Sequence, residues 1–419
     1  MARKVRWLWM VAVGSILLTV LGASPASAAN PAVIVGTSNT SILVHHGTSF
    51  TNVTGMSIPS GTWFVTATAT VEATSYGNVP GIITTCQLAG GSDKDQGSWA
   101  LTGDTQGRSI GSVFLTLVHT ASTGWLVNLD CKTDASTGDV SVRSIRISAL
   151  KGSTSSGSPR LRSASRAATV AGVADGSFHA VLTLKVPPGR WWIVARTNAA
   201  NTYSSDTNGP RCELKLGTDI DQTNVGLYYP PQAGTRETIS VQVGHVFSTS
   251  GPAALRCRAS HPFSTDHVRI IAVQAGKLVR KTFGGSSSSA GSGTPTVITG
   301  HADGPLSLAG GATGTTLGTL ALPAGKWLVS AKAVFQDGSA FLVTCKLVLG
   351  VSTADQVDSR GGPTGFAGMY LQGGHVFSST GTAKLVCTDQ KGALGDVNAW
   401  YIRITAVSAS TLTQVTLLA

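Results

Sequence analysis

The stretch that decides the fold is Val186-Pro187-Pro188-Gly189-Arg190-Trp191-Trp192-Ile193-Val194-Ala195, in which a Pro-x-Gly-x-Trp element precedes an apolar run. Proline and glycine are typical of a turn, and alternating apolar residues predict a strand with one buried face. The element recurs as Pro59-Ser60-Gly61-Thr62-Trp63 and as Pro323-Ala324-Gly325-Lys326-Trp327. A spacing of roughly 130 residues therefore indicates an internal repeat.

Further landmarks follow this element in the same order in every copy. They are a Cys-x-Leu-x-x-Gly motif, an Asp-Gln pair, a histidine that ends a strand, a second cysteine, and an apolar strand with a central arginine. Their positions are Cys86, Asp95, His119, Cys131 and Arg146, then Cys212, Asp221, His245, Cys257 and Arg269, then Cys345, Asp355, His375, Cys387 and Arg403. This recurrence predicts three tandem modules of one fold.

Six cysteines in an exported chain indicate disulfides, and the sequence has no Cys-x-x-Cys pair of the kind that binds zinc. The simplest pairing lies within each copy: Cys86 with Cys131, Cys212 with Cys257, and Cys345 with Cys387. Other pairings remain open, because six cysteines allow fifteen connectivities. A disulfide of this loop length stabilises a domain by about 4 kcal/mol on the chain-entropy description.

The first residues resemble a secretory signal. A basic start, an apolar run and the small residues Ala26-Ser27-Ala28 predict cleavage after Ala28, with no membrane span left after processing. Losing Arg3, Lys4 and Arg6 lowers the formal charge from +11 to +8. Because these charges are not clustered with stacking aromatics, we expect no nucleic-acid partner. The expected location is secreted, either extracellular or associated with the cell wall.

Composition divides the chain into modules and linkers. Gly/Ser-rich segments at 152–165 and 284–294 are typical of flexible linkers. We therefore expect a signal peptide at 1–28 and modules at 29–151, 166–283 and 295–419. Short Val, Ile, Thr and aromatic runs separated by Gly, Asp, Asn and Ser predict strands, with no helical period. The predicted fold class is all-β, with three antiparallel β-sandwich modules, each holding one disulfide.

The Val-Pro-Pro-Gly-Arg-Trp stretch at 186–191 and the later Cys-x-Leu strand resemble jelly-roll modules of the tumour necrosis factor and complement globular-head superfamily. Exported proteins of actinomycete type also look like this. The resemblance implies a jelly-roll sandwich. It also implies that three copies could pack as an internal trimer, since modules of that superfamily typically trimerise. Beads on a string remain the alternative arrangement.

Two motifs could carry chemistry. Gly107-Arg108-Ser109-Ile110-Gly111 has the spacing of a hydrolase nucleophile elbow, which works only at a strand-to-helix turn, so a turn is the favoured interpretation. The repeated histidines His119, His245 and His375 could meet as metal ligands on an axis. We favour instead a histidine that binds the adjacent loop, and we expect no metal and no cofactor.

Three other repeated residue types have structural interpretations. The repeated aspartates could bind calcium, but turn formation is favoured. The repeated arginines are expected to face solvent or a neighbouring module, because alternation turns them away from the flanking isoleucines. The repeated tryptophans are expected in the core. The aspartates are Asp95, Asp221 and Asp355, the arginines Arg146, Arg269 and Arg403, and the tryptophans Trp63, Trp191 and Trp327.

Aromatic residues outside the repeat are the predicted ligand contacts. Trp99, Tyr203, Tyr228 and Tyr229 lie in expected loops, where aromatics commonly stack on sugars or bind a partner protein. The predicted function is a secreted, non-enzymatic binding or surface-structural protein, with a cell-wall or extracellular polysaccharide or a protein as the partner. The alternatives are a self-assembling pseudo-trimeric structural protein and, less favoured, a secreted hydrolase.

Overall fold

The computed structural model describes most of the chain after residue 29. The described ranges are 30–73, 82–101, 110–134, 138–153, 159–202, 209–224, 236–308, 314–339, 341–361, 366–390 and 397–417. These residues form strands, turns and bridges and contain no helix, which confirms the all-β prediction. Consequently they include no helix long and apolar enough to cross a membrane. The expected signal at 1–28 lies outside the described residues.

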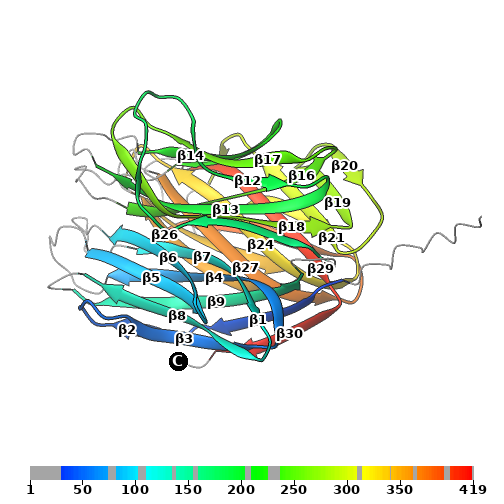
Figure 1. The fold of residues 1–419 in the computed structure, drawn as a ribbon, viewed down its shortest axis with the longest axis horizontal. Coiled ribbons are helices and arrows are strands. Elements are labelled where there is room, and N and C mark those ends of the chain that lie inside the picture. Colours follow the sequence, from blue (N-terminus) through cyan, green and yellow to red (C-terminus); the bar gives the residue numbers. More distant parts are fainter. Residues whose placement is uncertain are drawn as a thin grey trace, which may run out of the picture.

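Each of the three modules contains an outer and an inner antiparallel sheet, packed face to face (Figure 1). In module 1 the outer sheet has the order β3-β8-β5-β6 and the inner sheet β1-β9-β4-β7, with β2 also paired to β9. The bounds are β1 (Ala32–Ser38), β2 (Ile42–Val44), β3 (Thr51–Ile58), β4 (Gly61–Ala73), β5 (Ile82–Gly90), β6 (Asp93–Leu101), β7 (Ile110–Ala121), β8 (Trp125–Thr133) and β9 (Val140–Gly152).

Modules 2 and 3 repeat this strand order. The bounds in module 2 are β10 (Leu161–Arg166), β11 (Val170–Ala171), β12 (His179–Val186), β13 (Gly189–Asn201), β14 (Arg211–Leu216), β15 (Asp219–Asn224), β16 (Arg236–Phe247), β17 (Gly251–Arg258) and β18 (Phe263–Ala275). Its outer sheet is β12-β17-β14-β15 and its inner sheet β10-β18-β13-β16. Two sheets of four main strands are the architecture of a jelly roll.

In module 3 the outer sheet is β23-β28-β25-β26, and the inner sheet β21-β29-β24-β27 is extended by β19 and β20. The bounds are β19 (Lys277–Thr282), β20 (Ser287–Ala290), β21 (Thr296–Ala302), β22 (Leu306–Ser307), β23 (Thr315–Leu322), β24 (Gly325–Gln336), β25 (Phe341–Leu349), β26 (Ser352–Gly361), β27 (Phe366–Phe377), β28 (Gly381–Asp389) and β29 (Asn398–Ala409). A last strand, β30 (Thr411–Thr416), belongs to the inner sheet of module 1.

The disulfides join facing positions on two neighbouring strands of each outer sheet. Cys86 of β5 lies opposite Cys131 of β8, and the same register holds for the other two pairs. The bonds are Cys86–Cys131, Cys212–Cys257 and Cys345–Cys387, as predicted, and all six residues are buried.

The inner sheets are buried on both faces, which explains the long apolar runs after each Pro-x-Gly-x-Trp element. Successive residues of a strand point to opposite faces. Trp191 thus lies in the core of its own module, whereas the next residue, Trp192, belongs to a separate central cluster. Trp63 and Trp327 are likewise buried in their own modules, as expected.

The central cluster joins the three inner sheets into one body. It takes Phe64 and Phe114 from module 1, Trp192 from module 2, and Leu328 and Tyr370 from module 3. The rings of Phe114 and Tyr370 stack with their centroids 3.7 Å apart. The modules therefore pack as an intramolecular pseudo-trimer and not as beads on a string.

Strands from the connecting segments close this ring. After module 2 the chain forms β19, which pairs in parallel with β21 of module 3. After module 3 it forms β30, which pairs in parallel with β1 of module 1. The segment 284–294, expected as a flexible linker, contains β20 paired to β19, and 152–165 contains the start of β10. Pairing with a free sheet edge orders serine-rich sequence that has little to bury.

Candidate functional site

The repeated aspartates do not form turns. Asp95, Asp221 and Asp355 lie within β6, β15 and β26, and their side chains are fully buried. In each case one carboxylate oxygen accepts the backbone N–H of the facing inner strand, from Thr116, Gln242 or Gln372, at 2.7–2.9 Å. The turn interpretation was wrong because the partners that compensate burial come from the next module, which local sequence does not show.

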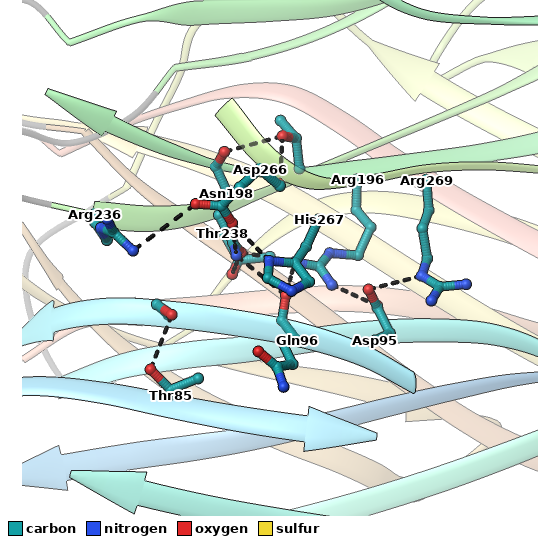
Figure 2. A network of polar contacts seen from close by, with 12 residues as sticks. Thr85, Asp95, Gln96, Arg196, Asn198, Arg236, Thr238, Asp266, His267 and Arg269 are labelled. Atoms are coloured by element: carbon teal, nitrogen blue, oxygen red, sulfur yellow. Dashed lines mark hydrogen bonds and ion pairs between the residues drawn. The ribbon is translucent and has the colours of Figure 1, made fainter. Parts of the chain in front are cut away.

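At the junction of modules 1 and 2, Asp95 binds two arginines of module 2 (Figure 2). Arg196 of β13, itself fully buried, contacts Oδ2, and Arg269 of β18 donates from Nε to Oδ1 at 2.8 Å. Arg196 also donates to the Gln96 carbonyl and to Asn198 Oδ1, at 2.7 Å each. The carboxylate of Asp95 thus holds β13 and β18 of module 2 against module 1.

The junction of modules 2 and 3 repeats the arrangement with a lysine. Lys332 Nζ lies 2.8 Å from Asp221 Oδ2, and Arg403 Nε lies 3.2 Å from Oδ1. The ammonium also donates to the carbonyls of Gln222 and Ser240, at 2.9 and 3.3 Å, so all three donors have acceptors. Burial nevertheless lowers the pKa of Lys332 to about 8, against the opposing charge of Asp221.

At the junction of modules 3 and 1 the buried aspartate binds one cation among the described residues, and Arg143 and Asp358 form a second ion pair across this junction. Arg146 Nε lies 3.4 Å from Asp355 Oδ1, and Thr68 occupies the position of Arg196 and Lys332, five residues after the repeated tryptophan. Burial raises the pKa of Asp355 to about 6, although Arg146 and two backbone N–H groups favour the charged form. The three junctions share a geometry and differ in charge balance.

These three clusters hold neighbouring modules together, and the cluster of the 2–3 junction shares Arg403 with a cleft described below. Each arginine of the Ile-Arg-Ile strand reaches a neighbouring module, which is one of the two expected alternatives. Buried ion pairs give little net stability but specify geometry, since a misplaced partner leaves an unpaired buried charge.

The repeated histidines lie apart from the axis, each against its own module. His119 Nδ1 lies 2.8 Å from Asp93, and His245 Nδ1 lies 2.6 Å from Asp219, both at the start of the neighbouring strand. His375 packs edge-on against Phe377. Asp93 and Asp219 belong to β6 and β15, so these two histidines bind the first residue of a strand and not the expected loop. The described residues contain no group of three metal-ligating side chains.

A polar cleft of about 380 Å³ opens at the junction of modules 2 and 3. Its walls come from β15 and β16, from the β19–β20 hairpin and from β21 and β29. Hydroxyl groups of the serines at 286–288 line one side, and Arg280, Lys281, His301 and Arg403 line the others.

Charges in the cleft are partly paired. Arg280 binds Asp219, and Arg403 Nη2 lies 2.6 Å from Asp303 Oδ1. Burial opposes ionisation of Asp219, but the hydrogen bond with His245 and the charge of Arg280 hold its pKa below the ordinary value. Burial and the charge of Arg403 lower the pKa of His301, so its imidazole is neutral at pH 7. The cleft therefore offers guanidinium, imidazole and hydroxyl groups at one accessible place.

The cleft depends on residues that differ between junctions. The parallel registers place Gln414 of β30 where β19 has Arg280, and the repeat places Thr353 where module 2 has Asp219. Gln414 donates to the Gly374 carbonyl at 2.9 Å. The charged pair and the β19–β20 hairpin are thus features of the 2–3 junction.

The predicted aromatic contacts are not brought together among the described residues. Trp99 lies in β6 with 4% of its surface exposed, inside the core of module 1, so its interpretation as a loop platform was wrong. Trp99 points into the core from β6, and the sequence did not show that this strand continues to Leu101. Tyr203, Tyr228 and Tyr229 lie outside the described residues. Gly107, Arg108 and Ser109 also lie outside them, and Ile110 begins β7.

Sequence reasoning missed the cations at the fifth position after the repeated tryptophan. Arg196 and Lys332 interrupt apolar strands, which signals a buried partner of opposite charge. Because these cations occur in copies that also carry a repeated aspartate, the sequence could have suggested that the two form ion pairs. Arg280 and Lys281 were missed because they lie next to the expected linker and outside the repeat.

Comparisons with known proteins identify no family for this chain. No family model and no curated protein matches it. Among solved structures, the insecticidal delta-endotoxin Cry8Ea1 from Bacillus thuringiensis aligns with 81% of this chain at 10% identity and a TM-score of 0.21. That alignment spans 55% of the toxin chain, so this chain matches about half its length.

Two further solved structures align as weakly. The CBM22-1–CBM22-2 tandem domain of Paenibacillus barcinonensis Xyn10C aligns over its full length with 60% of this chain, at 10% identity and a TM-score of 0.17. A structure of infectious bursal disease virus, Gx strain, aligns over 83% of its chain with 92% of this one, at 8% identity and a TM-score of 0.12. None of these alignments adds support to the resemblance to the tumour necrosis factor superfamily, which rests on the sequence motif alone.

Proposed function

We propose that the protein is an extracellular, non-enzymatic binding protein, assembled by one chain as a ring of three sandwich modules. The cleft at the 2–3 junction is its ligand-contacting surface, and a hydroxyl-rich extracellular polysaccharide is its ligand. The observation that carries this proposal is the cleft itself, which gathers Arg280, Lys281, His301 and Arg403 with serine hydroxyls.

Two features support a binding role over catalysis. The buried aspartate of each junction binds a cation of the neighbouring module, and His119 and His245 bind aspartates of their own modules. Three disulfides are compatible with an oxidising, extracellular setting. Fork-shaped guanidinium donors suit hydroxyl and carboxylate groups, which polysaccharides of cell walls carry.

The test is retention of the purified mature chain on insoluble peptidoglycan, chitin and cellulose, measured over a salt series. We expect retention on at least one polymer that persists at 0.5 M salt, roughly where the Debye length falls below 5 Å and non-specific attraction is screened. Failure to bind any of the three at low salt would overturn the polysaccharide assignment.

A double variant locates the binding surface. Arg280→Gln with Lys281→Gln removes two cleft cations and introduces, at 280, the residue found at the equivalent place in β30. We expect it to lose at least tenfold in retention. The control is Arg162→Gln with Lys185→Gln, which makes the same charge change at two exposed positions of module 2. Equal loss in both variants would assign retention to net charge and remove the cleft from the proposal.

A further inference from the structure

A second cavity, of about 530 Å³, lies beside the Pro-x-Gly-x-Trp turn of module 3. This volume is in the range of small-molecule sites, which is roughly 300–1,000 Å³. Apolar groups from four elements line its body. They are Val279 of β19, Ile298 of β21, Leu322 of β23, Pro323 of the turn and Trp327 of β24.

Three lysines, Lys277, Lys281 and Lys326, line the same cavity. Because strand side chains alternate, Lys277, Val279 and Lys281 of β19 project to one face, with the apolar residue between the two cations. Lys326 donates to the Ser410 carbonyl at 2.9 Å. No carboxylate occurs among the described residues that line the cavity. An apolar body with a purely cationic lining complements an amphiphilic anion.

The cavity exists in module 3 because a small residue faces the repeated tryptophan there. The pairing partner of Trp327 is Ser408, whereas Trp63 pairs with Lys151 and Trp191 with Gln274. In module 1 the Lys151 ammonium lies 5.8 Å from the Trp63 ring, so its chain covers the corresponding space.

The lysines are also specific to module 3. The parallel registers place Thr411 and Val415 of β30 at the positions of Lys277 and Lys281 of β19. The repeat places Thr62 of module 1 and Arg190 of module 2 at the position of Lys326. The cavity and its three lysines therefore coincide in module 3.

We propose that this cavity binds a small amphiphilic carboxylate, with the carboxylate between Lys277 and Lys281 and the hydrocarbon part against Val279, Ile298 and the edge of Trp327. Ammonium groups bind the charged head, and the apolar wall removes the hydrocarbon from water. This site shares Lys281 with the cleft at the 2–3 junction, but it lies against the apolar residues of module 3 and does not depend on a polysaccharide ligand.

Isothermal titration of the mature chain tests the charge and the apolar requirement together. The probes are decanoate, decanol and decyltrimethylammonium, each below its micelle-forming concentration. We expect one saturable decanoate site, at least tenfold weaker binding of decanol and no binding of the cation. Absence of saturable decanoate binding at millimolar concentration, or equal binding of the cationic probe, overturns the proposal.

Variants then place the site. Ser408→Lys introduces the residue of module 1 into the cavity, and Lys277→Gln with Lys281→Gln removes the head-group cations; each should weaken decanoate binding at least tenfold. Lys151→Ser, the matched control in module 1, should leave decanoate binding unchanged, because Thr411 and Val415 supply no charge there. Thermal unfolding checks that each variant folds. If Ser408→Lys does not fold, the test rests on the Lys277→Gln, Lys281→Gln variant. Unchanged affinity in the lysine variant would contradict the site.

Discussion

At the scale of single residues, three equivalent carboxylates have unequal partners. Asp95 and Asp221 each bind two cations of the next module, whereas Asp355 binds Arg146 and faces Thr68 instead of a second cation. At Asp355 burial opposes ionisation, and the single arginine compensates this only in part, so the pKa of Asp355 is raised. The stability of the 3–1 junction should therefore follow the protonation of Asp355.

The first prediction concerns Thr68→Lys, which supplies the missing cation. The folded-state pKa of Asp355, about 6, lies above its unfolded value near 3.8, so ionisation lowers the stability of the folded state as pH rises between these values. A lysine at 68 should lower that pKa. We expect the variant to gain about 1–3 kcal/mol more relative to the natural chain at pH 7.5 than at pH 4.5, because a shift of one pKa unit corresponds to about 1.4 kcal/mol.

The measurement is urea unfolding of both chains at the two pH values. Comparing the chains cancels the acid dependence of other carboxylates, such as Asp219 and Asp266, whose pKa values are lowered and which therefore destabilise on acidification. An identical stability difference at pH 4.5 and 7.5 would show that Asp355 does not titrate in this range.

The second prediction concerns Asp95→Asn, which leaves Arg196 and Arg269 without a countercharge. Breaking a buried pair by removing one partner destabilises by about 3–5 kcal/mol. The matched control is Asp93→Asn, two residues earlier on β6, where the half-exposed side chain binds His119 of its own module. We expect the control to lose less than about 1 kcal/mol by urea unfolding. Equal losses would contradict a special role for Asp95.

Which residues could be predicted from sequence depended on where their partners lie. The cysteines and the repeated tryptophans were predicted because their partners belong to the same module and recur with it. Asp95 was misinterpreted because Arg196 and Arg269 come from another module and lie more than 100 residues away in sequence. Trp99 was misplaced because short polar residues before it suggested a loop, although β6 runs through it.

At the scale of elements, the inner strands show how alternation fails when both faces are buried. β13 is apolar on consecutive positions, Trp191 facing one core and Trp192 another, so periodicity alone indicated only that the run was a strand. The ends of the expected modules 2 and 3 show a related effect. β19 falls within the expected module 2 but pairs with β21 of module 3, and β30 falls within the expected module 3 but pairs with β1 of module 1. Composition does not show these pairings, because each partner lies in another module.

The third prediction concerns β30. A chain that ends at Ser410 loses the parallel partner of β1 and also Leu417, which is buried in the core of module 1. We expect hydrogen exchange in β1 to accelerate at least about tenfold, since removing a buried leucine side chain alone destabilises by about 2–5 kcal/mol.

Module 3 supplies the internal control, because β21 keeps its partner β19 in the shortened chain. Exchange in β21 should change much less than exchange in β1. If both strands accelerate equally, the ring unfolds as one unit and β30 does not act locally on module 1.

At the scale of the whole molecule, three sandwiches share one central cluster and three charged junctions, and they are built from one chain. The fourth prediction follows. Small-angle scattering of the mature chain should give a single compact particle with a radius of gyration of about 21 Å, the value typical of one folded body of roughly 390 residues. A profile of three separately tumbling bodies would contradict the ring.

The repeat allowed three modules and their sandwich class to be predicted, because each landmark recurs at the same place. Whether the modules form a ring could not be decided, since the contacts that close it lie between Asp355 and Arg146 and between β30 and β1. Those partners come from the first and the third module, which are far apart in the sequence. The cleft was beyond prediction for the same reason, because Arg280 binds Asp219 of another module. The cavity was beyond prediction because it depends on the strand register that places Ser408 opposite Trp327.

The pairing of β30 with β1 has a consequence for the order in which the molecule is made. A ribosome synthesises β1 more than 350 residues before β30, as the positions 32–38 and 411–416 show. Until β30 has been synthesised, the nascent first module has an unpaired sheet edge at β1, and such an edge can pair with strands of other chains. The module that is translated first is thus the one that matures last.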